Sequence, residues 1–178
     1  MAFTDLAPEI IQAILDCLEA VQDLAECRLV CKAWKPISEQ LMLRKKIFLM
    51  SEENVLQLVY HLKKAPPFGK LVKYVVFDFQ ENATANDVYL KLLSFIFTPN
   101  LLVLDGYIPI KNIYKEMLSI ARESPKKFDK LQVIPQEQHM AINSNDFKTA
   151  CLLFKKSLKV VTITFTDENK PNWTIGSL

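Results

Sequence analysis

Four short segments rich in branched apolar residues recur along the C-terminal two thirds of the chain at nearly even spacing. They begin at Leu71, Leu101, Leu131 and Leu158, so successive starts lie 30, 30 and 27 residues apart. Valine and isoleucine favour β-strands because their branched side chains pack well on a pleated surface. A nearly fixed period of this length is typical of repeat folds, in which each unit buries its apolar face against the next.

A stretch with helical periodicity precedes each of these predicted strands. Apolar residues three and four positions apart mark four expected helices, at 53–64, 87–97, 113–122 and 146–156. The breaks between helix and strand contain prolines, at Pro66, Pro99 and Pro125. The sequence therefore predicts an α/β region with about four parallel strands, in which a helix–strand unit repeats four times. We expect the polar tail from Thr166 to Leu178 to be either a loose C-terminal cap or the remnant of a longer array.

The first fifty residues carry helical stripes rather than a strand pattern. Pro8 suits the first position of a helix, where its missing N–H costs nothing. Two apolar stripes follow, made of Ile11, Ile14, Leu15 and Leu18, then of Leu24, Cys27, Cys31 and Trp34. Pro36 disfavours continuing the second helix through Lys35. Because Ile10 and Cys17 widen the first stripe, we expect the first helix to use one face for its own core and another for a partner.

Composition and charge narrow the classes of partner. The chain of 178 residues is 50% hydrophobic and 24% charged, which is ordinary for a folded protein. Its net charge of +2 is too small to indicate a nucleic-acid partner. The sequence contains no run of about 18 apolar residues, so it predicts no membrane span. The N-terminus has no signal-peptide pattern. We therefore expect an intracellular protein, in the cytoplasm and/or nucleus, whose four cysteines are thiols.

Motifs for catalysis or for cofactor binding are missing from the sequence. With only three glycines, the chain has no glycine-rich phosphate loop, and it has neither a nucleophile elbow nor a zinc-binding helix motif. The two histidines, His61 and His139, are isolated and are expected to be solvated. Asp78 and Glu81 are close in sequence, but carboxylates at such spacing are usually surface charges. The sequence predicts no enzyme, no cofactor and no metal site.

Two motifs near the N-terminus resemble those of the F-box. They read Leu6-x-Pro8-Glu9-Ile10-Ile11-x-x-Ile14-Leu15-x-x-Leu18 and Asp23-Leu24-x-x-x-Arg28-Leu29-Val30-Cys31-Lys32-x-Trp34. The resemblance covers roughly residues 4–48. The chain departs from the family pattern where Ala7 separates Leu6 from the proline, and where Leu43-Arg44 replaces a leucine–tryptophan pair. The resemblance implies an all-α F-box of three short helices at residues 1–49.

An F-box implies binding to a Skp-family linker, which connects to a cullin and a RING protein. Amphipathic helices hide apolar side chains in a partner's groove, and large apolar anchors carry most of the binding energy. The implied linker-binding residues are Leu6, Pro8, Ile11, Leu15, Leu18, Leu24, Val30, Cys31 and Trp34. The alternative is that such residues form only an internal three-helix core, and this interpretation is favoured for Ile14 and Cys27.

The period near 30 and the run Thr98-Pro99-Asn100-Leu101-x-x-Leu104-Asp105 resemble the leucine-rich repeats that follow F-boxes. The resemblance implies a short, irregular helix–strand solenoid at residues 50–178. An irregular four-stranded α/β layer is the alternative, because the asparagine ladder of such repeats is absent. Alternation along the strands predicts a substrate-facing row made of Lys73, Val75, Val103, Asp105, Val133, Pro135, Val160 and Thr162.

Together these patterns predict the substrate-receptor subunit of an SCF-type ubiquitin ligase. The F-box would hold the linker, and the repeat region would hold a protein substrate near the ubiquitin-loaded enzyme. Catalysis by this chain would be positional, through raised effective concentration. The alternative is an interaction or scaffold protein without ligase function that uses the same helices and the same repeat surface.

Overall fold

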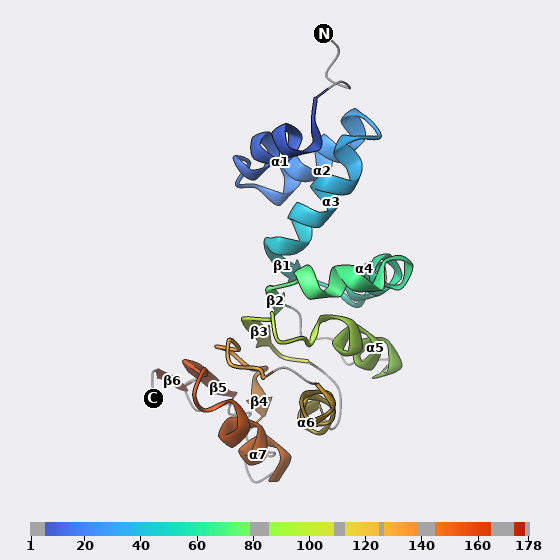
Figure 1. The fold of residues 1–178 in the computed structure, drawn as a ribbon. Coiled ribbons are helices and arrows are strands. Elements are labelled where there is room, and N and C mark those ends of the chain that lie inside the picture. Colours follow the sequence, from blue (N-terminus) through green and yellow to red (C-terminus); the bar gives the residue numbers. More distant parts are fainter. Residues whose placement is uncertain are drawn as a thin grey trace. The chain divides into compact units, whose positions relative to one another are not determined.

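The computed structural model describes residues 6–78, 86–108, 113–124, 127–138, 145–164 and 173–176. The chain divides into two compact units, Met1–Lys46 and Ile47–Leu178. The N-terminal unit, blue to cyan in Figure 1, contains helices, whereas helices and strands alternate in the second unit.

The N-terminal unit is built from α1 (Pro8–Asp16), α2 (Val21–Val30) and α3 (Trp34–Arg44). Pro8 begins α1, as its missing N–H favours. The break between the second and third helices falls at residues 31–33, and Pro36 lies within the first turn of α3. The second helix does not continue through Lys35, as expected, since it already ends at Val30. Lys35 and Pro36 belong to the first turn of α3, where proline is tolerated because the first N–H groups of a helix have no partner within it.

The second unit begins with β1 (Lys46–Leu49), α4 (Glu52–Lys64), the 3-10 helix η2 (Pro66–Leu71), β2 (Tyr74–Phe77), α5 (Asn86–Ile96) and β3 (Val103–Gly106). It continues with α6 (Ile113–Glu123), β4 (Glu137–Gln138), α7 (Asn145–Phe154), β5 (Val160–Thr164) and β6 (Trp173–Gly176). Each of the four expected helices is present, with ends that differ from the expected ones by at most two residues.

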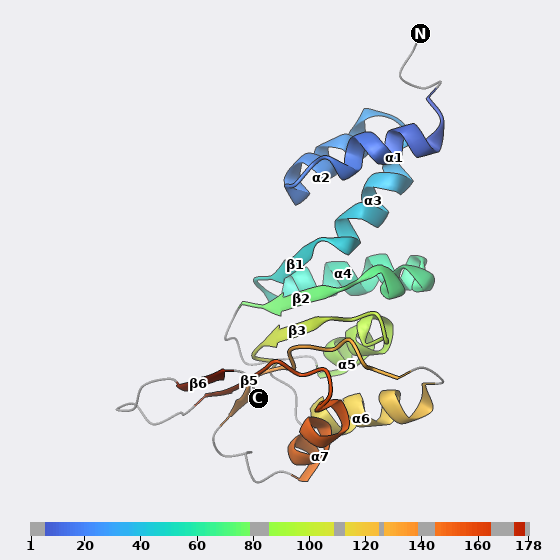
Figure 2. The same cartoon turned by 60° about the vertical axis from the view of Figure 1, so that its left-hand side comes forward.

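The strands form a small, mainly parallel sheet system in two parts. The order is β1-β2-β3 in one part and β4-β5-β6 in the other. β2 and β3 pair in parallel, as do β4 and β5, whereas β6 runs antiparallel to β5. Single parallel bridges from Val133 to Val103 and to Val160 connect the two parts. Both views show α4, α5 and α6 on one side of β1, β2 and β3 (Figures 1 and 2).

Two strand predictions need correction. The segment Leu131–Pro135 forms isolated bridges only at Val133, one to Val103 and one to Val160, and the strand β4 follows it. Pro135 cannot donate a ladder hydrogen bond, which limits pairing at this point. The strands β1 and β6 were not predicted, and β6 falls in the tail that was expected to be a loose cap.

The interior of the second unit repeats with the strands. Equivalent residues at the start of the four strand segments are buried, namely Val72, Leu101, Leu131 and Leu158. A second buried set follows three residues later, at Val75, Leu104 and Ile134. Tyr74 pairs with Val103. The first helix–strand repeat is therefore shifted by one residue from the alignment that the leading leucines predict.

Gly106 allows β2 and β3 to end close together. Its backbone φ is +88°, a left-handed conformation that only glycine adopts readily. A Cβ atom at this position would overlap the carbonyl oxygen of Phe77, its partner on β2. The absence of a side chain is therefore a steric requirement of this pair of strands.

None of the helices within the described ranges combines the length and the continuous apolar character that crossing a bilayer requires.

Candidate functional site

Four of the residues predicted to bind a linker lie inside the N-terminal unit. Ile11, Leu15, Leu24 and Trp34 are buried, and together with Leu41 they form its core. Side chains from all three helices meet in this cluster. Their prediction as direct linker contacts is corrected, because a residue that already fills its own core has no surface left to offer a partner.

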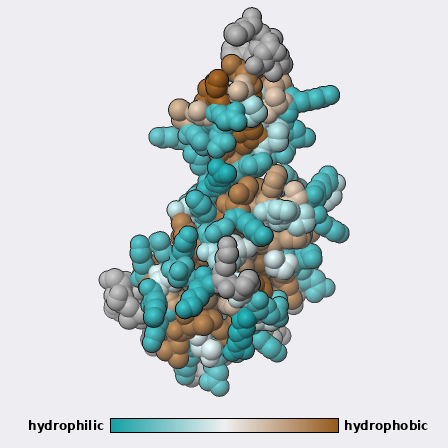
Figure 3. Space-filling model, in the orientation of Figure 1, coloured by the Kyte–Doolittle hydropathy of each residue, from teal (hydrophilic) through white to brown (hydrophobic). Residues whose placement is uncertain are grey.

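A different set of apolar side chains is exposed on the same unit. Ile10 and Ile14 lie one turn apart on α1, and Leu29 and Val30 end α2. Leu29 has an exposed fraction of 78% and Val30 one of 59%. The space-filling view shows apolar surface over these N-terminal helices (Figure 3). Ile14 was expected to be a core residue, and its exposure corrects that expectation.

Of the remaining predicted linker-binding residues, Pro8 and Val30 are exposed and three are half-buried. Leu6, Leu18 and Cys31 pack against the edge of the core and keep part of their surface free. Sequence reasoning missed Ile10 and Leu29 as candidates. The available signal was the second pair of isoleucines at i, i+4 on α1 and the adjacent apolar pair at the end of α2.

The thiol of Cys27 lies at the edge of this core. Partial burial, together with the nearby carboxylates of Asp23 and Glu26, raises the pKa of Cys27 above its ordinary value. The expectation that Cys27 belongs to the core is met in part, since it is half-buried and packs against the cluster. A raised pKa favours the neutral thiol over the thiolate, and the thiolate is the reactive form.

The predicted substrate row on the strands is corrected at two positions. Val75 is fully buried and Pro135 is also buried, so neither is available to a partner. Lys73 is exposed but precedes β2 by one residue. The half-buried positions that share one face are Tyr74, Val76, Val103, Asp105, Val133, Val160 and Thr162.

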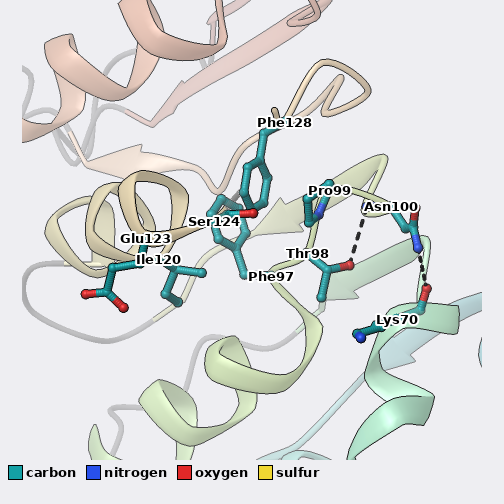
Figure 4. Close-up of a pocket in the computed structure, with 9 residues that line it drawn as sticks. All are labelled: Lys70, Phe97, Thr98, Pro99, Asn100, Ile120, Glu123, Ser124 and Phe128. Atoms are coloured by element: carbon teal, nitrogen blue, oxygen red, sulfur yellow. Dashed lines mark hydrogen bonds between the residues drawn. The ribbon is translucent and has the colours of Figure 1, made fainter. Parts of the chain in front are cut away.

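A cavity of about 400 Å³ lies where the helix-to-strand loops of the second unit meet (Figure 4). The amide nitrogen of the Asn100 side chain donates to the carbonyl oxygen of Lys70, 3.0 Å away and 30 residues earlier. The rings of Phe97 and Phe128 stack at 4.7 Å between centroids. Figure 4 shows Lys70 and Glu123 on opposite sides of the cavity. The hydrogen bond joins successive loops, and this role is structural.

The groups considered for chemistry do not come together in the part of the chain that the structure describes. His61 is half-buried beside Phe68, with 6.3 Å between ring centroids, and Asp78 is exposed. Glu81 and His139 lie outside the described residues, as does most of the tail from Thr166. Within the described ranges, no three histidine, cysteine or acidic side chains cluster in a way that could hold a metal ion.

Comparison with known protein families identifies an F-box-like domain. The matching family model is described as F-box-like and covers residues 3–50. The match spans the three helices and β1, and it ends before α4. Neither curated proteins nor solved structures gave a match to this chain. The chain therefore carries an F-box-like domain, of the kind through which adaptors of SCF ligases in general bind a Skp-family linker.

Proposed function

We propose that the chain is a substrate-receptor subunit of an SCF-type ubiquitin ligase. The observation that carries the proposal is the coincidence of the F-box-like match with a small helical unit that exposes several large apolar side chains. Exposed apolar surface of this kind is typical of a site for another protein. The linker would join the chain to a cullin and a RING protein.

The linker-binding surface in this proposal consists of the exposed residues Ile10, Ile14, Leu29 and Val30, with Pro8 beside them. Leu6, Leu18 and Cys31 form its half-buried edge. The core residues Ile11, Leu15, Leu24 and Trp34 support this surface from within. Burying a large apolar side chain contributes roughly 1.5–3 kcal/mol, so several such side chains together can offset the entropy that is lost on association.

The second unit serves as the substrate-binding part in the same proposal. We assign residues 1–49 to the F-box and residues 50–178 to a short leucine-rich-repeat-like domain. We place the protein inside the cell. The substrate would lie on the strand face formed by Tyr74, Val76, Val103, Asp105, Val133, Val160 and Thr162. The chain would act by holding a substrate near the ubiquitin-loaded enzyme, which raises its effective concentration.

Assembly with the purified ligase components tests this function. We expect the chain to co-elute with a Skp-family linker, a cullin and a RING protein, and the assembly to transfer ubiquitin to a fused or bound protein. Leu29→Asp should abolish assembly because it places a charge in an apolar interface. Leu152→Asp on α7 is the matched control, because Leu152 is 67% exposed and lies in the other unit.

Assembly with the linker but without the cullin, and without ubiquitin transfer, would instead favour the scaffold alternative. Equal loss of assembly in both variants would show that Leu29→Asp acts through general destabilisation.

A further inference from the structure

A second apolar concavity lies between α7 and β5, in the second unit. This α7–β5 groove has a volume of about 240 Å³ and is lined by Phe147, Cys151, Lys155, Leu158, Lys159, Val161 and Ile163. Phe147 and Cys151 lie one turn apart on α7, Lys155 directly follows the C-terminal end of this helix, and Val161 and Ile163 alternate on β5. One helical stripe and one face of a strand therefore form its two walls.

Packing against α6 fixes Phe147, the aromatic residue in the wall of the groove. The ring of Phe147 packs edge-on against Tyr114 of α6, with 5.1 Å between centroids. The hydroxyl of Tyr114 is buried and donates to the carbonyl oxygen of Pro135 at 2.7 Å. Leu158 is buried on the connection to β5. Because these contacts fix the aromatic wall, a ligand would enter a preformed site and lose less entropy on binding.

The connection between α7 and β5, along one side of the groove, is positively charged, whereas Glu137 of β4 is the register neighbour of Ile163. Lys155 and Lys159 line the groove and are exposed, and Lys148 and Lys156 are exposed nearby in sequence. Asp146 is the one acidic residue between 145 and 164. This segment therefore carries a larger excess of positive charge than the whole chain, whose net charge is only +2. An apolar concavity beside lysines complements an apolar side chain flanked by acids.

Pairing of β5 restricts how a partner can bind. The strand has β4 on one side and β6 on the other, so an extended peptide cannot add to it as a further strand. Recognition must instead proceed by insertion of side chains into the groove. Nucleic acid would satisfy the lysines but leave the apolar walls unfilled, and a flat membrane surface has nothing to insert into a concavity.

We propose that the α7–β5 groove is a docking site for a short protein segment that inserts a large apolar side chain and flanks it with aspartate or glutamate. This inference does not depend on linker binding by the N-terminal unit. The groove is separate from the strand face that we propose for a substrate. Either of these two proposals can therefore be disproved without affecting the other.

Selection of short random peptides displayed on phage, with the full chain as bait, tests the proposal. We expect enriched peptides to combine a leucine, phenylalanine or similar anchor with neighbouring acids. Replacing the anchor by alanine in the best synthetic peptide should weaken its binding by about tenfold or more, because the anchor fills the groove. An absence of enrichment, or enriched peptides that lack acids or an anchor, would overturn the proposal.

Charge reversal of the lysines that line the groove gives the matched comparison. Lys155→Glu with Lys159→Glu should weaken binding of that peptide by about tenfold, whereas Lys63→Glu with Lys64→Glu on α4 makes the same change in net charge and should have little effect. Circular dichroism melting confirms that both double variants are folded. Equal weakening in both, or equally tight binding of a single-stranded oligonucleotide or of phosphatidylserine vesicles at the same lysines, would show attraction by charge alone and overturn the proposal.

Discussion

The hydroxyl of Ser38 is an unusual feature at the scale of single residues. Ser38 is fully buried on α3, and its hydroxyl has no hydrogen-bond partner among the residues that the structure describes. Leaving a buried polar group unpaired costs about 1–3 kcal/mol. We therefore expect Ser38→Ala to raise the free energy of unfolding by about 1 kcal/mol, measured by urea denaturation followed by circular dichroism. A loss of stability would mean that the hydroxyl has a partner in solution.

The side chains of α1 show the limit of sequence periodicity at the same scale. Ile10 and Ile14 form one i, i+4 pair, and Ile11 and Leu15 form another, displaced by a single residue. One residue turns a helix by roughly 100°, so the two pairs lie on different faces. The sequence predicted two apolar faces for this helix. Which face packs inward depends on α2 and α3, and periodicity within α1 carries no information about them.

At the scale of elements, the start of α4 is held by reciprocal capping. The backbone N–H of Asn54 donates to the Ser51 hydroxyl at 3.3 Å, and the Asn54 side chain accepts from the backbone N–H of Met50 at 3.1 Å. Losing a serine N-cap costs about 1 kcal/mol. We expect Ser51→Ala to lower the free energy of unfolding by that amount in the same urea assay.

Ser51→Ala and Ser38→Ala remove the same hydroxyl group, but we expect them to change the free energy of unfolding in opposite directions. A gain or no change in stability for Ser51→Ala would contradict the capping role that the hydrogen bonds indicate.

Strand positions were harder to predict than helices. The leading leucines gave the correct spacing for the last three units, where Leu101, Leu131 and Leu158 are equivalent. In the first helix–strand repeat, the 3-10 helix η2 extends to Leu71, and Val72 takes the equivalent buried position. A shift of one residue moves a strand's side chains to the opposite face. This shift explains why Val75 was predicted as a substrate contact although it is buried.

At the scale of the whole molecule, the two units have separate cores. Leu15 belongs to the N-terminal core, and Leu15→Ala should destabilise that unit by about 2–5 kcal/mol through the cavity it leaves. Hydrogen exchange followed by mass spectrometry should then show faster exchange in α1, α2 and α3, with little change in β2 and β3. Equal acceleration in both units would contradict independent cores.

The F-box-like domain was predictable because its two motifs combine residue types at fixed spacing, and the family match covers the same region. The helix–strand alternation of the second unit was predictable from periodicity. The neighbours of its strands were not, since β1 and β6 pair with β2 and β5 through backbone groups. Backbone hydrogen bonds leave little trace in the sequence, and strands of only four residues, such as β1 and β6, are at the lower limit of length for an alternating pattern.

We propose that the exposed apolar residues of the N-terminal unit bind a Skp-family linker. Calorimetric titration of the purified linker into the purified chain measures this binding, with Leu29→Asp and Leu152→Asp compared with the wild-type protein. We expect saturable binding for the wild type and for Leu152→Asp, and binding weakened at least about a hundredfold in Leu29→Asp, the scale of one lost anchor. Absence of wild-type binding, or unchanged affinity in Leu29→Asp, would rule out this surface as the linker site.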